Sequence, residues 1–461
     1  MRAHEAGALH GDLGSRGPAW LRTPEDVNAL VPELWPRTVT RNGAGALTVG
    51  GLDVRDLAAE FGTPAYILDE DDLRSRCREF RDAFAGADVF YAGKAFLCKA
   101  IVRVIAEEGL SLDVCSGGEL AVALAAGMPP ERIGLHGNNK SVRELERALD
   151  AGIGRIVVDS FDEIDRLTEI ARRTGTRPSV MIRVTVGVEA HTHEYIATAH
   201  EDQKFGFSLG GGAAAAAAAK IIKENALDLR GLHSHIGSQI FDTSGFELSA
   251  KRVLGLQELV RDEHGVELPE LDLGGGFGIA YTTRDDPATP ADLADSLVKL
   301  VKHECANRHL GMPHLSVEPG RAIVGPAVFT LYEVGTVKDV DGIRTYVSVD
   351  GGMSDNIRTA LYDASYSATV AGRTSAAPPI LARVVGKHCE AGDVVVKDEF
   401  LPADVRPGDL LAVPGTGAYC RSMASNYNHV PRPPVIAVAN GSARVIVRRE
   451  TEDDLLALDV G

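Results

Sequence analysis

Apolar and polar positions alternate with a regular rhythm through the middle of the chain. Eight short runs rich in apolar residues lie between residues 88 and 320, and they read DVFYAGK, LSLDVCS, RIGLHGN, RIVVDS, SVMIRVTV, LRGLHSHIG, ELDLGGG and HLSVEPG. Most of them are separated by segments with helical periodicity, such as VRELERALDAG and FDEIDRLTEIARRTG. Eight strands that alternate with helices over roughly 230 residues approach the length of a (β/α)8 barrel, about 250 residues. The pattern therefore predicts an α/β fold of the TIM-barrel type.

The pattern changes after Gly320. The segments that follow have patterns typical of strands and turns, and few long helical segments lie among them. Examples are TYVSVDGG, ARVVGKHCEAGDVVV, GDLLAVPGTGAY and ARVIVRRE. This composition predicts a second, mainly β domain. Residues 1–45 lack sustained periodicity and are expected to form a partly ordered tail. The parts expected after the tail are an N-terminal segment that packs with the β domain and joins the two domains (46–69), a barrel (70–326) and a C-terminal β domain (327–461).

Composition and charge narrow the functions open to the chain. Its 461 residues carry 48 basic and 65 acidic side chains, and the net charge of -17 disfavours binding to nucleic acid or to anionic lipid. The six cysteines are scattered without a C-x-x-C pair, so neither a zinc site nor a disulfide framework is expected. No apolar run approaches the roughly 18 to 20 residues of a membrane span, and the first residues lack the apolar core of a signal peptide. We therefore expect a cytoplasmic protein without membrane or nucleic-acid partners.

Polar side chains gather where the predicted strands end. Active sites of this fold lie at the carboxyl ends of the strands. Taken singly, a lysine there is usually solvated, a histidine is usually structural and a glycine run is usually a tight turn, but convergence on one rim favours a functional site. The residues at these ends are Lys94, Asp113, His136, Asn138, Asp159, Arg183, His235, Ser238, the glycines 274 to 276, Glu318 and Arg321.

A phosphate ligand fits one side of this rim. The LDLGGGFG loop follows the seventh strand and EPGR follows the eighth, where such barrels commonly bind phosphate through backbone N–H groups. Lys94, a phosphate cradle and the Glu318 carboxylate on one rim together suggest a Schiff base with pyridoxal phosphate.

Six motifs in order carry a resemblance to a known family. The segments YAGKAF, GLHSHIGSQ, LDLGGGFG, EPGR, KHCEAGD and GAY resemble the alanine-racemase-like, barrel-type pyridoxal-phosphate decarboxylases. The similarity is closest to the actinobacterial members that decarboxylate diaminopimelate. It runs from about Asn28 to the C-terminus, and residues 1–25 fall outside it.

The resemblance implies a role for each residue at the cofactor. Lys94 would be the catalytic lysine that binds pyridoxal phosphate, and Asp113 would lie close to it. Glu318 would pair with the pyridine nitrogen and keep it protonated, which favours decarboxylation over racemisation. His233 has no such role by this match and is read as structural. The other residues implied at the cofactor are His235, stacked on the ring, with Ser238, Gly275, Gly276, Arg321 and Tyr419.

The resemblance also implies a substrate and a partner subunit. Cys389 would come from the partner of a homodimer and act as a general acid, so the active sites would be shared across the interface. Meso-diaminopimelate has a carboxylate and an ammonium at its distal end. Arginines are suited to bind the carboxylate, and Glu390 is suited to bind the ammonium. The residues implied around the substrate are Arg321, Arg358, Tyr362, Glu390 and Tyr419.

The expected activity is the decarboxylation of meso-2,6-diaminopimelate to L-lysine and carbon dioxide, the last step of lysine biosynthesis. One alternative is a sister enzyme that acts on ornithine, lysine or arginine, and Arg358 together with Glu390 argues against it. A second alternative is a catalytically silent regulatory homologue, against which Lys94 and Cys389 argue.

No metal is expected. His191, His193 and His200 lie close together in EAHTHEYIATAHEDQ, but no cysteine or acidic spacing there supports a closed site.

Overall fold

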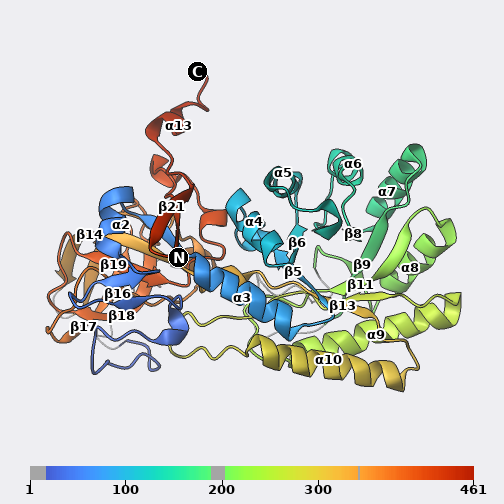
Figure 1. Cartoon of the computed structure of the whole chain (residues 1–461), viewed down its shortest axis with the longest axis horizontal. Helices are drawn as coiled ribbons and strands as arrows, with labels where there is room; N and C mark the ends of the chain where they lie inside the picture. Colours follow the sequence, from blue (N-terminus) through green and yellow to red (C-terminus); the bar gives the residue numbers. More distant parts are fainter. Residues whose placement is uncertain (1–16, 188–202, 341–342) are drawn as a thin grey trace, which may run out of the picture. The chain divides into compact units, whose positions relative to one another are not determined.

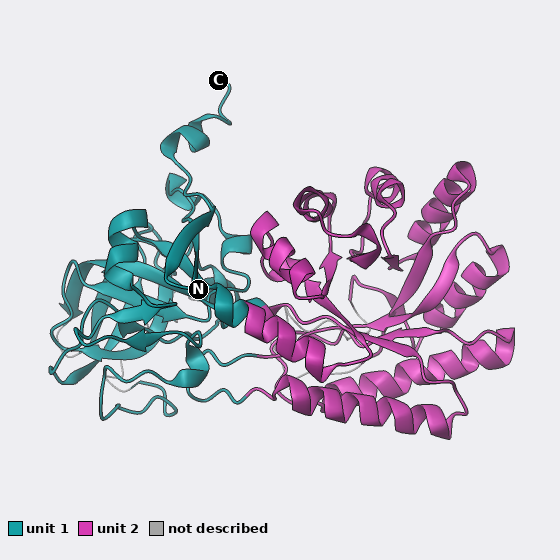
Figure 2. Cartoon of the chain, in the orientation of Figure 1, with its two compact units in different colours: residues 1–73, 279–286, 324–461 teal, residues 74–278, 287–323 magenta. Residues whose placement is uncertain are grey.

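The structure is a computed structural model of the chain, and it describes residues 17–187, 203–340 and 343–461. The chain folds into two compact units, which Figure 2 shows in different colours. Unit 1 comprises Met1–Leu73, Ile279–Asp286 and Val324–Gly461, and unit 2 comprises Arg74–Gly278 and Pro287–Ile323. Residues 279–286 therefore belong to unit 1, although they fall inside the range expected for the barrel.

Unit 2 is a closed barrel of eight parallel strands. Each strand pairs with the next in the order β5, β6, β7, β8, β9, β11, β12 and β13, and β13 pairs with β5 to close the ring. The predicted (β/α)8 barrel is confirmed, and each strand coincides with one of the eight apolar runs, with β11 beginning one residue before its run. The strands are β5 (Asp88–Ala92), β6 (Ser111–Val114), β7 (Ile133–Leu135), β8 (Arg155–Val158), β9 (Ser179–Thr185), β11 (Asp228–Ser234), β12 (Glu270–Asp272) and β13 (His314–Val317).

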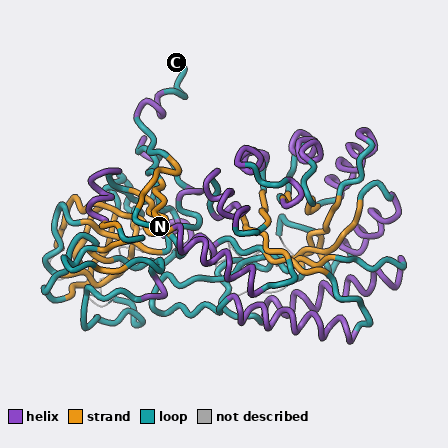
Figure 3. Tube along the Cα trace, viewed as in Figure 1, coloured by secondary structure: helices purple, strands orange, loops and turns teal. Residues whose placement is uncertain are grey.

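Helices surround the strands of the barrel (Figures 1 and 3). Their ends follow local sequence signals: Ser141 caps α6 in a capping box with Glu144, and Gly152 ends the same helix in the left-handed conformation. The longer helices are α3 (Glu70–Ala83), α4 (Lys99–Glu107), α5 (Gly117–Ala126), α6 (Val142–Ala151), α7 (Phe161–Thr174), α8 (Ala213–Glu224), α9 (Ser244–His264) and α10 (Pro290–Asn307). The short elements are η2 (Gly93–Ala95), η3 (Pro130–Arg132), β10 (Phe207–Ser208) and α11 (Arg321–Val324).

A charged group lies inside the barrel. Arg155 of β8 is buried, and its guanidinium pairs with Asp272 of β12 and donates a hydrogen bond to Ser316 Oγ of β13 at 3.0 Å. The same guanidinium lies 3.8 Å from the centroid of the Phe90 ring. Asp272 in turn accepts the N–H of Gly274 at 2.8 Å. This network ties the strands to the start of the glycine-rich loop.

Unit 1 is built around a nine-stranded sheet. Its main path runs β18, β17, β15, β14, β4, β20 and β21, and off this path β19 pairs with β14 while β16 pairs with β19. The N-terminal strand β4 (Ala65–Asp69) pairs antiparallel with β14 and parallel with β20, so the N-terminal segment is part of this sheet. The other strands of the sheet are β14 (Val328–Val340), β15 (Arg344–Val349), β16 (Thr369–Val370), β17 (Pro379–Val385), β18 (Val394–Pro402), β19 (Leu410–Pro414), β20 (Val435–Ala439) and β21 (Ser442–Val447).

Smaller elements complete unit 1, whose mainly β character is as predicted. A second sheet has three short antiparallel strands, β1 (Thr40–Arg41), β2 (Leu47–Val49) and β3 (Leu52–Asp53). The remaining elements are α2 (Val54–Phe61), α12 (Arg358–Tyr362), α13 (Glu452–Leu456), η1 (Pro32–Leu34), η5 (Arg421–Met423) and η6 (Tyr427–His429).

The core of unit 1 includes residues from the range expected as a tail. Leu34, Trp35 and Val39 are buried, and the rings of Trp35 and Phe329 lie 6.0 Å apart. Arg41 anchors the segment by donating to the carbonyls of Asn28 at 2.8 Å and of Gly45 at 2.8 Å. Single apolar residues that insert into a sheet core leave no periodic pattern, so no feature of the sequence indicated this packing.

Within the described ranges, no helix is both long enough and apolar enough to cross a membrane.

Candidate active site

Lys94 lies directly beyond β5, in the short helix η2. Its side chain is exposed to a cavity of about 310 Å³ in unit 2. Gly93 before it allows the strand end to approach its neighbour, because a Cβ at Gly93 would lie 2.8 Å from the carbonyl oxygen of Asp113. The cavity is lined by Ala92, Gly93, Lys94, Asp113, Cys115, His136, Gly137, Asn138, Arg183, Lys204, Phe205, His235 and Glu318.

The strand ends meet at this cavity, as the barrel geometry requires. Four residues expected at the cofactor, namely Lys94, Asp113, His235 and Glu318, line it together. The other polar residues of the rim that line it are His136, Asn138 and Arg183. Asp159, another rim residue, accepts the backbone N–H of Gly206.

The glycine-rich turn runs close to neighbouring backbone. A Cβ at Gly275 would lie 2.0 Å from the carbonyl oxygen of Glu318, and one at Gly276 would lie 2.3 Å from that of Gly237. Gly276 also has a φ of +113°, a conformation that favours glycine. Larger residues would therefore displace this turn.

His235 and Ser238 are held by neighbours within unit 2. The N–H of Gly275 donates to Nδ1 of His235 at 3.2 Å, which makes Nδ1 an acceptor. Burial, then Lys94 and Arg183, hold the pKa of His235 well below its usual value, so the ring is neutral. Ser238 Oγ accepts a hydrogen bond from Arg321 Nη2 at 2.9 Å. Residues expected at the cofactor therefore form linked pairs, His235 with Gly275 and Ser238 with Arg321.

Glu318 follows β13 and is buried among charged and polar side chains. Its Oε1 lies 3.1 Å from Nε2 of His136 and 3.1 Å from Nε2 of His233. His136 Nε2 also lies 3.2 Å from Oδ1 of Asp113. Burial raises the pKa of Glu318, but His233 and His136 outweigh it and hold the pKa well below the usual value. Glu318 is therefore an anion at the wall of the cavity.

Several atoms of this cluster are close without being aligned as hydrogen bonds. Oε1 of Glu318, both oxygens of Asp113 and Nε2 of His136 are buried, and none has a well-aligned hydrogen-bond partner among the described residues. Buried polar atoms without such partners next to a cavity fit a polar ligand. A carboxylate with a free acceptor position suits the protonated nitrogen of a pyridine ring, so these residues fit pyridoxal phosphate. His136, His233 and Glu318 are also close enough together to ligate a metal, with ligand atoms within 4.8 Å of one another.

Arg358 begins α12 in unit 1 and is buried between aromatic rings. Its guanidinium donates to the hydroxyl of Tyr366 and lies 4.6 Å from the centroid of the Tyr281 ring. Burial lowers the pKa of Arg358, but Tyr281 and Tyr366 outweigh it and raise the pKa above the usual value. The side chain is a permanent cation in an aromatic frame. Tyr362 ends the same helix and is half-buried.

Tyr419 adopts a backbone conformation that is rare for its residue type. It has a φ of +62°, in the left-handed region, and its side chain is half-buried. Bulky residues in that region carry strain of roughly 1 to 3 kcal/mol and are found most often at functional sites.

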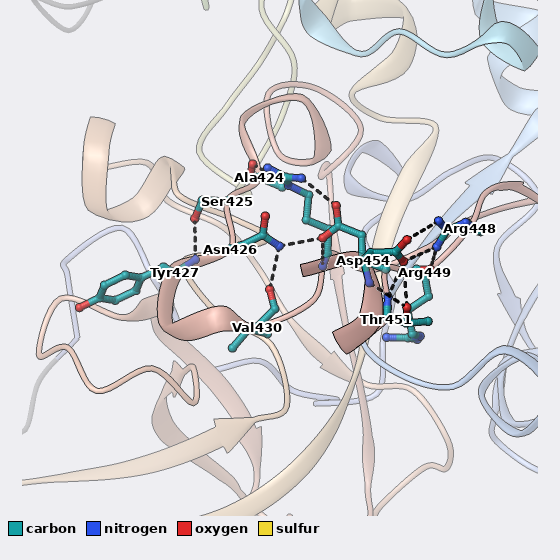
Figure 4. Close-up of polar contacts among 11 residues, drawn as sticks. Ala424, Ser425, Asn426, Tyr427, Val430, Arg448, Arg449, Thr451 and Asp454 are labelled. Atoms are coloured by element: carbon teal, nitrogen blue, oxygen red, sulfur yellow. Dashed lines mark hydrogen bonds and ion pairs between the residues drawn. The ribbon is translucent and has the colours of Figure 1, made fainter. Parts of the chain in front are cut away.

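Cys389 and Glu390 are exposed in the turn between β17 and β18. The N–H of Cys389 donates to Oδ1 of Asn428 at 3.1 Å. The loop that carries Asn428 is itself anchored: Asn426 Nδ2 donates to Glu450 Oε2 at 2.7 Å and to the carbonyl of Val430 at 3.2 Å (Figure 4). Backbone contacts thus fix the position of Cys389 while its thiol stays accessible.

Reasoning from the sequence did not find Tyr281, Tyr366 or Asn428. None of the three lies at a strand end of the barrel or in one of the six motifs, so no pattern pointed to them. From the sequence, His233 is interpreted as structural. In the structure, its ring lies next to the same oxygen of Glu318 as the ring of His136. His191, His193 and His200 lie outside the described residues.

The family comparison agrees with this site. The family described as pyridoxal-dependent decarboxylase, pyridoxal binding domain, matches residues 70–325, which contain the whole lysine cavity. The fold and site therefore define a pyridoxal-phosphate-dependent decarboxylase.

Relatives narrow the class further. Diaminopimelate decarboxylase of Mycobacterium tuberculosis is 58% identical over 440 residues, which cover 94% of this chain and 98% of the relative. The Bacillus subtilis enzyme of the same name is 47% identical over 92% of this chain and 97% of its own length. The crystal structure of diaminopimelate decarboxylase from M. jannaschii with L-lysine is 32% identical, with a TM-score of 0.86 over 92% of this chain and 98% of that one. The chain belongs to the diaminopimelate decarboxylase family.

Proposed function

We propose that this chain decarboxylates meso-2,6-diaminopimelate to L-lysine and carbon dioxide with pyridoxal phosphate. The observation that carries the proposal is one cavity lined by a lysine and by a buried, ionised carboxylate, Lys94 and Glu318. When bound, pyridoxal phosphate supplies an electron sink for the bond that breaks as carbon dioxide leaves. The residues of the chain then have to hold the ring, orient the substrate and deliver a proton.

In this proposal Lys94 binds the cofactor through its amine, and Asp113 lies beside it at the cavity wall. Glu318 accepts the N–H of the pyridine ring, because an anionic carboxylate keeps that nitrogen protonated. The neutral ring of His235 stacks on the cofactor. The backbone at Gly275 and Gly276, with Ser238, Arg321 and Tyr419, would hold the phosphate.

The distal end of the substrate is assigned to residues of unit 1. Arg358 binds the distal carboxylate, and its burial between two tyrosines supports this role because a preorganised guanidinium loses little freedom on binding. Glu390 binds the distal ammonium. Tyr362 and Tyr419 complete the assignment in unit 1, and Arg321, which belongs to unit 2, is assigned to the substrate as well.

Cys389 is proposed as the acid that protonates the product carbon, acting from the partner subunit of a homodimer. The exposure of Cys389 and Glu390 on unit 1 supports this, since exposed side chains on a turn can contact a neighbouring subunit. The anchoring of the Cys389 backbone by Asn428 supports it as well, because a proton donor has to be held in place.

We further propose a cytoplasmic location. All six cysteines are free thiols in the structure, as is usual in a reducing compartment.

An assay of the purified protein with four substrates tests the proposal. Meso-diaminopimelate, lysine, ornithine and arginine are supplied side by side, and carbon dioxide release is measured. We expect turnover of meso-diaminopimelate and little of the others, because only it offers a distal carboxylate to Arg358. Preferred turnover of lysine or ornithine would support the sister-enzyme alternative, and a holoenzyme inactive on all four would support the silent homologue.

A further inference from the structure

Two buried histidines contact one oxygen of Glu318 at the same distance. Nε2 of His136 and Nε2 of His233 each lie 3.1 Å from Oε1 of Glu318. Their rings meet edge to face with centroids 5.0 Å apart, and they expose only 6% and 0% of their surface. His233 lies in β11, and His136 directly follows β7. Distance and burial alone therefore do not distinguish the two rings.

A second carboxylate distinguishes them. His136 Nε2 also lies 3.2 Å from Asp113 Oδ1, so His136 lies between two carboxylates. Among the described residues, His233 lies within ion-pair distance of Glu318 alone. Two buried carboxylates that share one neighbour repel each other unless a cation lies between them. The position of His136 suits an imidazolium, and that of His233 suits a neutral ring.

The electrostatic balance agrees with this geometry. Burial by itself lowers the pKa of His136, but Glu318 and Asp113 outweigh it and raise the pKa to about 9. Burial lowers the pKa of His233, and Glu318 only partly offsets it. Burial and then Glu318 raise the pKa of Asp113 to about 7. The charged or titratable groups that act on this cluster include Asp113, His136, His233, Glu318, Glu119, Arg155, Asp272, His235 and Cys115.

We propose that His136 is a charged positioning residue that keeps Glu318 ionised and aimed at the cavity, whereas His233 orients the same carboxylate without carrying charge. The inference rests on the proposed function, in which Glu318 faces the pyridine nitrogen. It explains why one carboxylate has two histidine neighbours: one supplies charge and the other supplies orientation.

The charge on His136 has a consequence for the cofactor. A cation beside Glu318 makes the carboxylate a weaker base, so the proton it shares with the ring stays on the ring nitrogen. Without that cation, Asp113 and Glu318 would be two anions in one buried site, and one of them would take up a proton. Either outcome weakens the hold on a protonated pyridine ring.

A pair of matched variants tests the inference. His136→Gln removes a charged ring and His233→Gln removes a neutral one, and both remove a contact to the same oxygen. Histidine labelled at Cε1 is followed by NMR in the wild-type holoenzyme between about pH 6 and pH 10, and each variant assigns one signal by its absence. Retention of pyridoxal phosphate is measured in parallel by absorbance during dialysis.

The His136 signal should titrate with a midpoint near 9, while the His233 signal should show no protonation midpoint above the usual value for histidine. The dissociation constant of pyridoxal phosphate should rise about tenfold or more in His136→Gln, the equivalent of one pKa unit. In His233→Gln it should rise by no more than about threefold, because the charge at Glu318 is preserved. Equal losses in both variants, or a His136 midpoint below 7, would overturn the inference.

If His136→Gln does not fold, Asp113→Asn provides a second test of the charge on His136. Removal of that carboxylate should lower the His136 midpoint by about one unit or more, since the carboxylate favours the charged ring. An unchanged midpoint would contradict the account, as would one equivalent of tightly held metal at the His136, His233 and Glu318 cluster. If the wild-type protein retains no pyridoxal phosphate at all, the proposed function fails, while the NMR midpoint still decides the charge of His136.

Discussion

The cofactor cavity of unit 2 is built from the ends of parallel strands, whereas the residues assigned to the substrate in unit 1 lie on a short helix and on turns. In the cavity, Asp113, His136 and Glu318 are buried and linked by charge. In unit 1, Arg358 is buried but Cys389 and Glu390 are exposed. The first region is organised by the barrel itself, and the second presents its reactive groups at the surface of the unit.

The difference indicates how the two tasks are divided. A cofactor that stays bound through every cycle suits groups fixed by strand ends and by a buried charge network. A substrate that enters and leaves suits groups on turns, which are easier to expose and to complete from a neighbouring subunit. We therefore expect substitutions in the cofactor cavity to abolish the chemistry of the cofactor. Substitutions among the substrate residues of unit 1 should instead weaken substrate affinity, or be rescued by an intact partner subunit.

The largest effect is expected from Lys94→Ala. Because Lys94 is the amine that the proposal assigns to the covalent bond with the cofactor, turnover and the visible absorbance of the lysine-bound cofactor should both be lost. Borohydride reduction followed by mass spectrometry of peptides measures the covalent bond directly.

Lys204→Ala is the matched control, because Lys204 lines the same cavity. That variant should keep the reducible bond. A covalent cofactor that persists in Lys94→Ala and disappears in Lys204→Ala would mean that the lysine has been wrongly assigned.

A smaller effect, confined to the substrate, is expected from Arg358→Ala. Loss of one partner of a buried charge pair costs about 2 to 5 kcal/mol. The KM for meso-diaminopimelate should therefore rise by about 25-fold or more, at about 1.4 kcal/mol for each factor of ten. Cofactor absorbance should not change, since Arg358 belongs to unit 1 and is not among the cavity residues.

Arg383→Ala serves as the control for Arg358→Ala. Arg383 is also a buried arginine of unit 1, but its guanidinium donates to the carbonyl of Lys397 at 2.8 Å. Its loss should lower stability and leave KM nearly unchanged. Similar increases in KM for the two variants would show that Arg358 has no special contact with the substrate.

The smallest effect is expected from Tyr366→Phe. The Tyr366 hydroxyl accepts a hydrogen bond from Arg358, and removing it frees the guanidinium to take other orientations. A loss of about 1 kcal/mol, roughly a fivefold rise in KM, is typical of one such hydrogen bond. Tyr332→Phe is the control, because this buried hydroxyl donates to Asp355 instead; it should change the melting temperature and not KM.

Much of the barrel could be predicted because its signal is local. Each of the eight strands is a short apolar run, and the strand-end rule then places Lys94, Asp113, His235 and Glu318 at one rim without any knowledge of contacts. The part of unit 1 formed by residues 279–286 could not be predicted, because it depends on long-range packing of a segment that follows the glycine-rich loop.

Roles that depend on neighbours were also hidden in the sequence. His136 and His233 lie almost 100 positions apart, and nothing in the sequence around them indicates different roles. Only their distances to Glu318 and Asp113 in the folded structure distinguish them. Tyr366 frames Arg358 from eight positions further along the chain, in a segment without periodicity. Sequence patterns report secondary structure, whereas charge sharing and aromatic contacts follow from the folded packing.

Mixing two inactive variants tests the division between the regions most directly. Lys94→Ala and Cys389→Ala homodimers should each be nearly inactive. After subunit exchange, random pairing makes about half of the dimers mixed, and each mixed dimer has one site with both residues intact and one with neither. Activity should return to about a quarter of the wild-type value per subunit. If mass spectrometry confirms exchange while activity stays at the level of the parents, Cys389 does not act on the partner's cofactor and the account of a shared site is contradicted.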